Sequence, residues 1–213
     1  MKGMHATQRD MTVFDEQFET LTGFRPMRWQ QRLYDEYFVS GALPSAISIP
    51  TGLGKTAVMA VWMIALAQQM KSGRAILPRR LVYVVDRCAV VDQATKFAED
   101  LRKYLAEKPE ALELRNALGL TDSNLPISTL RGQFVDNREW LEDPAKPAII
   151  VGTVDMIGSR LLFEVYCVSL KMWPYHAGLL GAEVFSLRYE AYLLPPFAAL
   201  PAAIAENAKR YGA

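Results

Sequence analysis

The segment over residues 50–56, which reads PTGLGKT, has the residue types and spacing of a phosphate-binding loop. Gly52 and Gly54 permit a backbone whose amides converge on anionic oxygens. Lys55 would supply positive charge to the β- and γ-phosphates of a nucleotide, and Thr56 would place its hydroxyl on Mg²⁺. This combination predicts a site that binds ATP with Mg²⁺, in which Lys55 also takes part in catalysis.

A glutamine upstream of this loop is a candidate for recognising the base. Gln30 follows Trp29, and its amide could hydrogen-bond the edge of adenine; the alternative is a solvated helix residue. A chance glycine turn before a helix is the weaker interpretation of the loop itself, because an apolar strand precedes it and an apolar helix follows in register. The predicted nucleotide-binding residues are Gln30, Thr51, Gly52, Leu53, Gly54, Lys55 and Thr56.

The elements that would position this loop follow an alternating order. Short apolar runs alternate with longer amphipathic stretches, as in parallel strands joined by crossover helices. Strands are predicted over residues 46–49, 81–85, 127–130, 148–151 and 183–187. Helices are predicted over residues 13–21, 27–38, 57–71, 89–105, 154–163 and 201–211. The pattern predicts an α/β fold with a central, mainly parallel sheet flanked by helices.

Composition limits the classes of protein that fit. The 213 residues are 51% apolar, which suits one folded domain. The formal net charge of +1 excludes a strongly basic, histone-like protein that binds nucleic acid. The first ten residues lack the apolar core of a signal peptide, so a soluble, cytoplasmic protein is expected. Cys88 and Cys167 are expected to be buried structural thiols, and His5 and His176 are too few for a histidine-rich metal nuclease centre.

Several segments together resemble the motifs of superfamily 2 helicases. Besides the loop over residues 50–56, these are residues 79–94, 128–134 and 149–163. Their wording is similar to the helicase-nuclease of type I CRISPR interference, particularly its type I-U (I-G) branch, from about residue 24 to residue 200. Helicase loops of this kind tolerate Ile49 where the general loop pattern has glycine. The resemblance implies a RecA-like fold and an ATP-driven motor that unwinds DNA opened by an RNA-guided surveillance complex.

The same resemblance implies residues that face single-stranded DNA. These are Arg131, Gly132 and Thr153, whose positions suit hydrogen bonds to phosphates without reading of bases. Each has a structural alternative that remains open. Thr153 could cap the helix that begins at residue 154, and Arg131 could form a surface ion pair.

The sequence departs from the family at the metal-binding motif. The family has Asp-Glu-Ala-His where this chain has Tyr189, Glu190, Ala191 and Tyr192. The aspartate normally holds Mg²⁺, and a phenol with a pKa of about 10 cannot replace it near neutral pH. Glu190 remains as the residue expected to orient the attacking water, and impaired ATP hydrolysis is predicted.

Residues 1–25 are interpreted as a helical lead-in and residues 26–213 as a first RecA-like domain, with the second RecA-like domain and the nuclease domain expected to be absent. Two other functions stay open. One is a non-catalytic nucleotide-binding or interaction module. The other is a small P-loop kinase, in which Asp86 after the strand over residues 81–85 would be the metal carboxylate.

Overall fold

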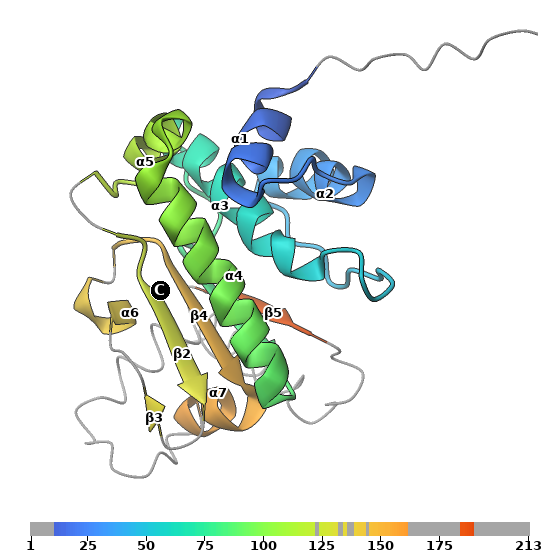
Figure 1. The fold of residues 1–213 in the computed structure, drawn as a ribbon, viewed down its shortest axis with the longest axis vertical. Helices are drawn as coiled ribbons and strands as arrows, with labels where there is room; N and C mark the ends of the chain where they lie inside the picture. The colour runs from blue at the N-terminus through green and yellow to red at the C-terminus, as the bar shows by residue number, and fades with distance from the viewer. Residues whose placement is uncertain are drawn as a thin grey trace, which may run out of the picture.

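The computed structural model describes residues 11–121, 124–131, 134–135, 139–143, 145–161 and 184–189 (Figure 1). The strands are β1 (Arg80–Val85), β2 (Ile127–Arg131), β3 (Phe134–Val135), β4 (Ala148–Thr153) and β5 (Val184–Arg188). The α-helices are α1 (Val13–Thr22), α2 (Arg28–Arg32), α3 (Val58–Lys71), α4 (Cys88–Glu107), α5 (Leu112–Ala117), α6 (Glu139–Glu142) and α7 (Val154–Leu161). A π-helical turn (Leu33–Tyr37) and 3-10 turns (Phe38–Ser40, Lys55–Ala57 and Pro109–Ala111) complete these elements.

The strands form one sheet in the order β3-β2-β4-β1-β5. β1 pairs in parallel with both β4 and β5, so Tyr83 lies between Val151 and Leu187. β2 is parallel to β4, and the short β3 is antiparallel to β2. The predicted α/β architecture with a mainly parallel sheet is therefore confirmed.

The sheet is covered on both faces, which explains why every residue of β1 is buried. Leu81, Tyr83 and Val85 face the larger core, which they share with α1, α3, α4 and α5. Val82 and Val84 face a smaller core on the side of α7. In Figure 1, α4 runs across the sheet on the side toward the viewer.

Helix α3 is buried on nearly all sides, with eleven of its fourteen residues inaccessible to solvent. Its one buried amide is fully used. Gln69 donates to the carbonyl of Phe38 at 2.8 Å and accepts hydrogen bonds from the amides of Ile76 and Leu77, each at 2.8 Å. Burial of these polar atoms is therefore offset by hydrogen bonds.

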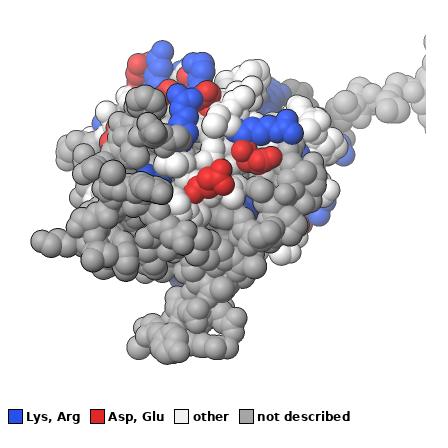
Figure 2. All heavy atoms as spheres, turned by 90° about the horizontal axis from the view of Figure 1, so that it is seen from below, with Lys and Arg blue, Asp and Glu red and all other residues white. Residues whose placement is uncertain are grey.

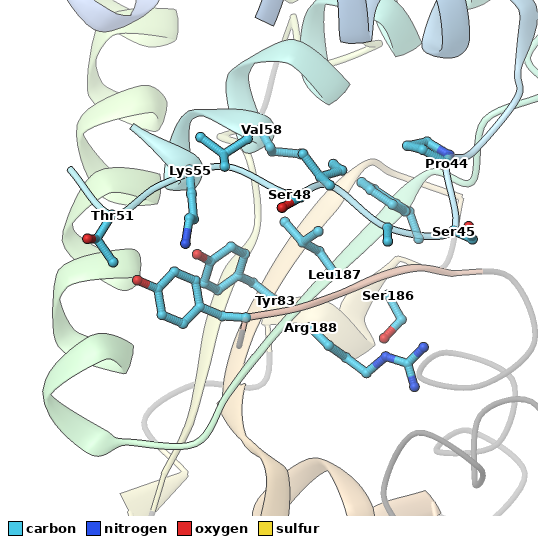
Figure 3. Close-up of a pocket in the computed structure, with 15 residues that line it drawn as sticks. Pro44, Ser45, Ser48, Thr51, Lys55, Val58, Tyr83, Ser186, Leu187 and Arg188 are labelled. Atoms are coloured by element: carbon cyan, nitrogen blue, oxygen red, sulfur yellow. The ribbon is translucent and has the colours of Figure 1, made fainter. Parts of the chain in front are cut away.

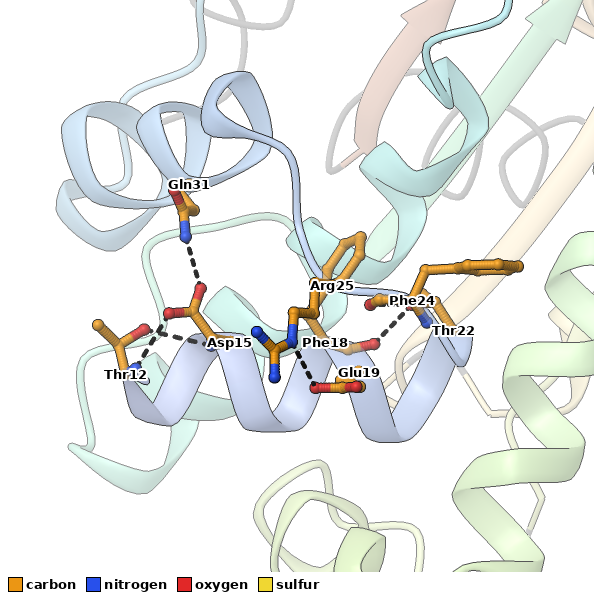
Figure 4. Close-up of polar contacts among 8 residues, drawn as sticks. All are labelled: Thr12, Asp15, Phe18, Glu19, Thr22, Phe24, Arg25 and Gln31. Carbon is orange, nitrogen blue, oxygen red and sulfur yellow. Dashed lines mark hydrogen bonds and ion pairs between the residues drawn. The ribbon is translucent and has the colours of Figure 1, made fainter. Parts of the chain in front are cut away.

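Helix α1 begins with a capping box and is tied to the segment that carries Gln30. Thr12 and Asp15 exchange side-chain to backbone hydrogen bonds of 3.0 and 3.2 Å, which satisfies two amides at the start of the helix. The second oxygen of Asp15 accepts a 2.8 Å hydrogen bond from Gln31 of α2 (Figure 4). This contact fixes α2 relative to α1.

The element predictions hold with several differences. The strand predicted over residues 46–49 is wrong: the segment forms no ladder pairing with a described strand, because a cavity separates it from β5. Cys88 is exposed at the start of α4, so the prediction of a buried thiol is wrong there. The turn of Pro109–Ala111 and helix α5 were not predicted. Residues 162–163, 183 and 201–211 of other predicted elements, and Cys167, lie outside the described residues.

No helix in the part of the chain that the structure describes is both long and apolar enough to cross a membrane.

Candidate nucleotide-binding site

The glycines of the loop adopt the backbone conformation that the sequence requires. Gly52 has a φ of 84° and Gly54 a φ of 66°, in the left-handed region where side chains with a Cβ are strained. Lys55 and Thr56 follow at once in the 3-10 turn that leads into α3. The loop therefore delivers both residues to the start of a buried helix, the arrangement that suits binding of phosphate groups.

Helix α2 supports the loop through two side chains. The indole of Trp29 donates to the carbonyl of Leu53 at 3.1 Å, and the amide of Gln30 lies 3.5 Å from the carbonyl of Gly54. The oxygen of the Gln30 side chain accepts a 2.7 Å hydrogen bond from the Met27 amide. Gln30 is only 3% exposed, so the alternative of a solvated helix residue is wrong. Its role toward adenine stays a prediction.

A cavity of about 580 Å³ opens beside the loop, between residues 44–51 and strand β5 (Figure 3). This volume falls in the range of small-molecule sites, roughly 300–1,000 Å³. Its lining consists of Pro44, Ser45, Ala46, Ile47, Ser48, Ile49, Thr51, Lys55, Val58, Tyr83, Phe185, Ser186, Leu187, Arg188 and Tyr189. Of the predicted nucleotide-binding residues, Thr51 and Lys55 line this cavity.

Tyr189 stands at the carboxyl edge of the sheet, one residue after β5. Its amide donates a 2.8 Å hydrogen bond to the carbonyl of Val84, which extends the pairing of β5 with β1. The Lys55 amine lies 5.2 Å from the centre of the Tyr189 ring, within the range of a cation–π contact. The residue at the predicted aspartate position thus contacts the lysine that is predicted to bind phosphate. Glu190 and Tyr192 lie outside the described residues.

Tyr83 of β1 lies next to this pair. Its ring centre is 6.4 Å from that of Tyr189, and in Figure 3 it lies at the end of the cavity where the Lys55 amine points. Tyr83 is 1% exposed, and its hydroxyl has no hydrogen-bond partner among the described residues. Burial raises the pKa of Tyr83 to about 12. The nearby Thr56 hydroxyl lowers this pKa by a smaller amount, although it forms no hydrogen bond of ordinary geometry with Tyr83. The phenol therefore stays neutral and able to donate.

The described side chains offer little to a divalent cation. They contain no group of three or more His, Cys, Asp or Glu that could hold a metal ion. Asp86 follows β1 at the same sheet edge, but it forms a 4.0 Å ion pair with Arg87 and does not line the cavity. Thr56 has the hydroxyl expected at a Mg²⁺ site, whereas the carboxylate position is Tyr189. A Mg²⁺ site of the usual kind does not fit these residues.

The residues predicted to face DNA also lie at the carboxyl edge, because β2, β4 and β1 are parallel. Arg131 forms an ion pair with Asp92 of α4, and the Thr153 hydroxyl accepts a 3.4 Å hydrogen bond from the Met156 amide. Both structural alternatives are therefore confirmed, and the roles toward DNA stay predictions. Gly132 lies outside the described residues.

A smaller hollow of about 280 Å³ lies between α4 and β2 near Arg131. Its lining carries both signs of charge: Asp92, Lys96, Glu99, Arg102 and Arg131. Figure 2 likewise shows acidic and basic side chains next to one another on the described part of the face seen from below. The described surface is therefore mixed in charge on this face.

Sequence reasoning missed two contributors to the site. The sequence pattern identifies Trp29 only as a neighbour of Gln30. In the structure its indole donates a hydrogen bond to the loop carbonyl of Leu53. The apolar run over residues 81–85 predicts Tyr83 only as one residue of a buried strand. The available signal was its hydroxyl, the only polar side-chain group in the run over residues 81–85.

The fold and the loop define a RecA-like, P-loop ATP-binding domain of the superfamily 2 helicase type. The chain belongs to the ResIII family, described as type III restriction enzyme, res subunit, whose family model matches residues 8–165. A comparison with curated proteins found no match.

Proposed function

We propose that this chain is the ATP-binding motor domain of a superfamily 2 DNA helicase that hydrolyses ATP poorly. The single observation that carries the proposal is the contact between Lys55 and Tyr189. The lysine belongs to a loop with the left-handed glycines and helix start of a phosphate site, which supports ATP binding. Tyr189 occupies the position where hydrolysis requires a carboxylate, which supports weak turnover.

We further propose a role in CRISPR interference, based on the resemblance of residues 50–56, 79–94, 128–134 and 149–163 to the type I helicase-nuclease. In that role the cytoplasmic domain would contact single-stranded DNA and an RNA-guided surveillance complex. Neighbouring reading frames that encode a second motor domain, a nuclease and CRISPR components would support this assignment. Neighbours belonging to a restriction system would contradict it.

Two measurements on the purified chain test the motor assignment. Titration with a fluorescent ATP analogue should give saturable binding, and steady-state ATPase activity should stay near background with or without single-stranded DNA. Absence of nucleotide binding would overturn the proposal. Brisk DNA-stimulated hydrolysis would show that the carboxylate side of the site has been misjudged.

A non-catalytic nucleotide-binding module is the second candidate, and Tyr189 is the observation that favours it. It shares the ATP-binding loop but would show no coupling between nucleotide and DNA. Binding of single-stranded DNA that changes when ATP is added would separate the motor from this module. The kinase alternative is weaker, because Asp86 does not line the cavity that contains Lys55.

A further inference from the structure

We propose that the cavity beside Lys55 binds the nucleotide as its metal-free polyanion, with the Tyr83 hydroxyl donating to a phosphate oxygen where a Mg²⁺ ion would otherwise act. This inference rests on the proposed ATP binding and specifies its chemical form. Its basis is the arrangement of three residues that line the cavity: Lys55 and Tyr83, which Figure 3 labels, and Tyr189, whose ring lies next to both.

The charge of the cavity favours an anion without a bound cation. Among the described residues that line the cavity, Lys55 and Arg188 are basic and none is an aspartate or glutamate. Metal-free ATP carries two more negative charges than its Mg²⁺ complex. Attraction to Lys55 therefore favours the metal-free form, and no carboxylate among the described lining residues offsets the repulsion between Lys55 and a dication.

Tyr83 supplies a donor that the protein itself leaves unused. Its hydroxyl exposes less than 1 Å² and has no partner among the described residues, although a buried polar group without a hydrogen bond destabilises the fold. The raised pKa, about 12, keeps this group protonated at every physiological pH. A phosphate oxygen would complete its hydrogen bonding.

Lys55 and Tyr189 lie beside the Tyr83 ring and bear on how a phosphate group would bind there. The Lys55 side chain is flexible and rests on the face of Tyr189 by a contact that is weaker than a charge-assisted hydrogen bond. An entering phosphate draws the amine toward itself. Lys55 and Tyr83 line the same cavity, so the two side chains can bind the same anionic group.

The test compares ATP affinity in excess Mg²⁺ with affinity in EDTA, by calorimetric titration of the full chain. We expect binding in EDTA to be at least as tight as in Mg²⁺. Tyr83→Phe should weaken binding in EDTA by about fivefold or more, since it removes one hydrogen bond to a charged oxygen. The matched control is Tyr34→Phe: Tyr34 stacks on Phe14 and does not line the cavity, so affinity should not change.

The outcomes separate this inference from the proposed function. Loss of binding in EDTA by about tenfold or more, with normal binding in Mg²⁺, would overturn the metal-free form and leave ATP binding intact. Failure to bind ATP in either buffer would instead refute the proposed function. Equal affinity of Tyr83→Phe and the unmodified chain in EDTA, with a cooperative unfolding transition showing that the variant is folded, would overturn the role of Tyr83.

Discussion

The amine of Lys55 lies 5.2 Å from the centre of the Tyr189 ring. The lysine predicted to bind phosphate therefore contacts an aromatic face at the position where the motifs it resembles have an aspartate. The contact is worth about 0.5–2 kcal/mol, depending on how far it is removed from water. It is too weak to prevent a triphosphate from recruiting the lysine, and it offers nothing to a metal ion.

Replacing the lysine should weaken nucleotide binding. Lys55→Ala removes a charge-assisted contact to phosphate, so we expect affinity for a fluorescent ATP analogue to fall by about tenfold or more, equal to about 1.4 kcal/mol or above. Lys96→Ala is the control, because Lys96 pairs with Asp100 on α4, away from this cavity. Identical affinities of the unmodified chain and Lys55→Ala would contradict the assignment of the loop.

The unpaired hydroxyl of Tyr83 should reduce stability. Tyr83→Phe keeps the ring and removes a buried polar atom with no partner among the described residues, so the free energy of unfolding should rise by about 1 kcal/mol at neutral pH. Urea unfolding of the two proteins measures this difference. Destabilisation by the substitution would show that the hydroxyl is satisfied within the protein.

The same residue predicts a loss of stability in alkali. The pKa of Tyr83 is about 12 in the folded protein, against 10.0 for the unperturbed group, so the folded state favours the protonated phenol. The free energy of unfolding is therefore unaffected by the ionisation of this group below pH 10. It falls by roughly 2–3 kcal/mol as pH rises toward 12, because the unfolded chain loses this proton first. Between pH 10 and pH 12 the free energy of unfolding should decline less for Tyr83→Phe than for the unmodified chain. An equal decline in the two proteins would contradict the raised pKa of Tyr83.

Restoring the family motif should recover part of the activity. The double change Tyr189→Asp and Tyr192→His replaces a phenol beside Lys55 with a carboxylate suited to Mg²⁺. We expect ATP binding to become tighter in Mg²⁺ and turnover to rise only slightly, because the double change restores the metal carboxylate and adds no residue that stabilises charge on the transferred phosphate. Steady-state ATPase assays and Mg²⁺ titrations measure both effects.

Asp86→Asn in the unmodified chain is the control for that experiment. Only the kinase alternative makes Asp86 the metal carboxylate, so the substitution should leave ATP binding unchanged. Hydrolysis by the unmodified chain that disappears in Asp86→Asn would identify Asp86 as the functional carboxylate.

Binding of single-stranded DNA should be weak, insensitive to sequence and reduced by salt, because the described surface at this sheet edge mixes both charges. Arg131→Ala should weaken DNA binding further, since Arg131 is a half-exposed cation at the end of β2. Filter binding at two salt concentrations measures this. Asp92→Ala is informative beside it: release of Arg131 from its ion pair should strengthen DNA binding, and a weakening would argue for a structural role of the pair.

Local patterns were enough to predict most of the described sheet. The strands over residues 81–85 and 148–151 are recognisable because burial on both faces requires continuous apolar runs, as in β1 and β4. The glycine loop was equally clear, since Gly52 and Gly54 do adopt positive φ. The segment over residues 46–49 failed because a strand also needs a neighbour to pair with, and the sequence of one segment does not contain that information.

The site was only partly predictable for a related reason. The motif position of Tyr189 fixed its place after β5, but its contact with Lys55 depends on parallel pairing between β5 and β1. Gln30 was singled out correctly for its nearness to the loop, whereas its internal hydrogen bonds to Met27 and Gly54 follow from how α2 packs. Such contacts between distant segments are set by tertiary structure.

The burial of α3 has a consequence for how this family can diversify. A substitution on this helix disturbs packed neighbours in almost every direction, because eleven of its fourteen residues are inaccessible. Tyr189, which follows β5, is only half-buried and is less constrained by packing. A change in the chemistry of the site is therefore less costly to packing at Tyr189 than on the helix that follows the loop.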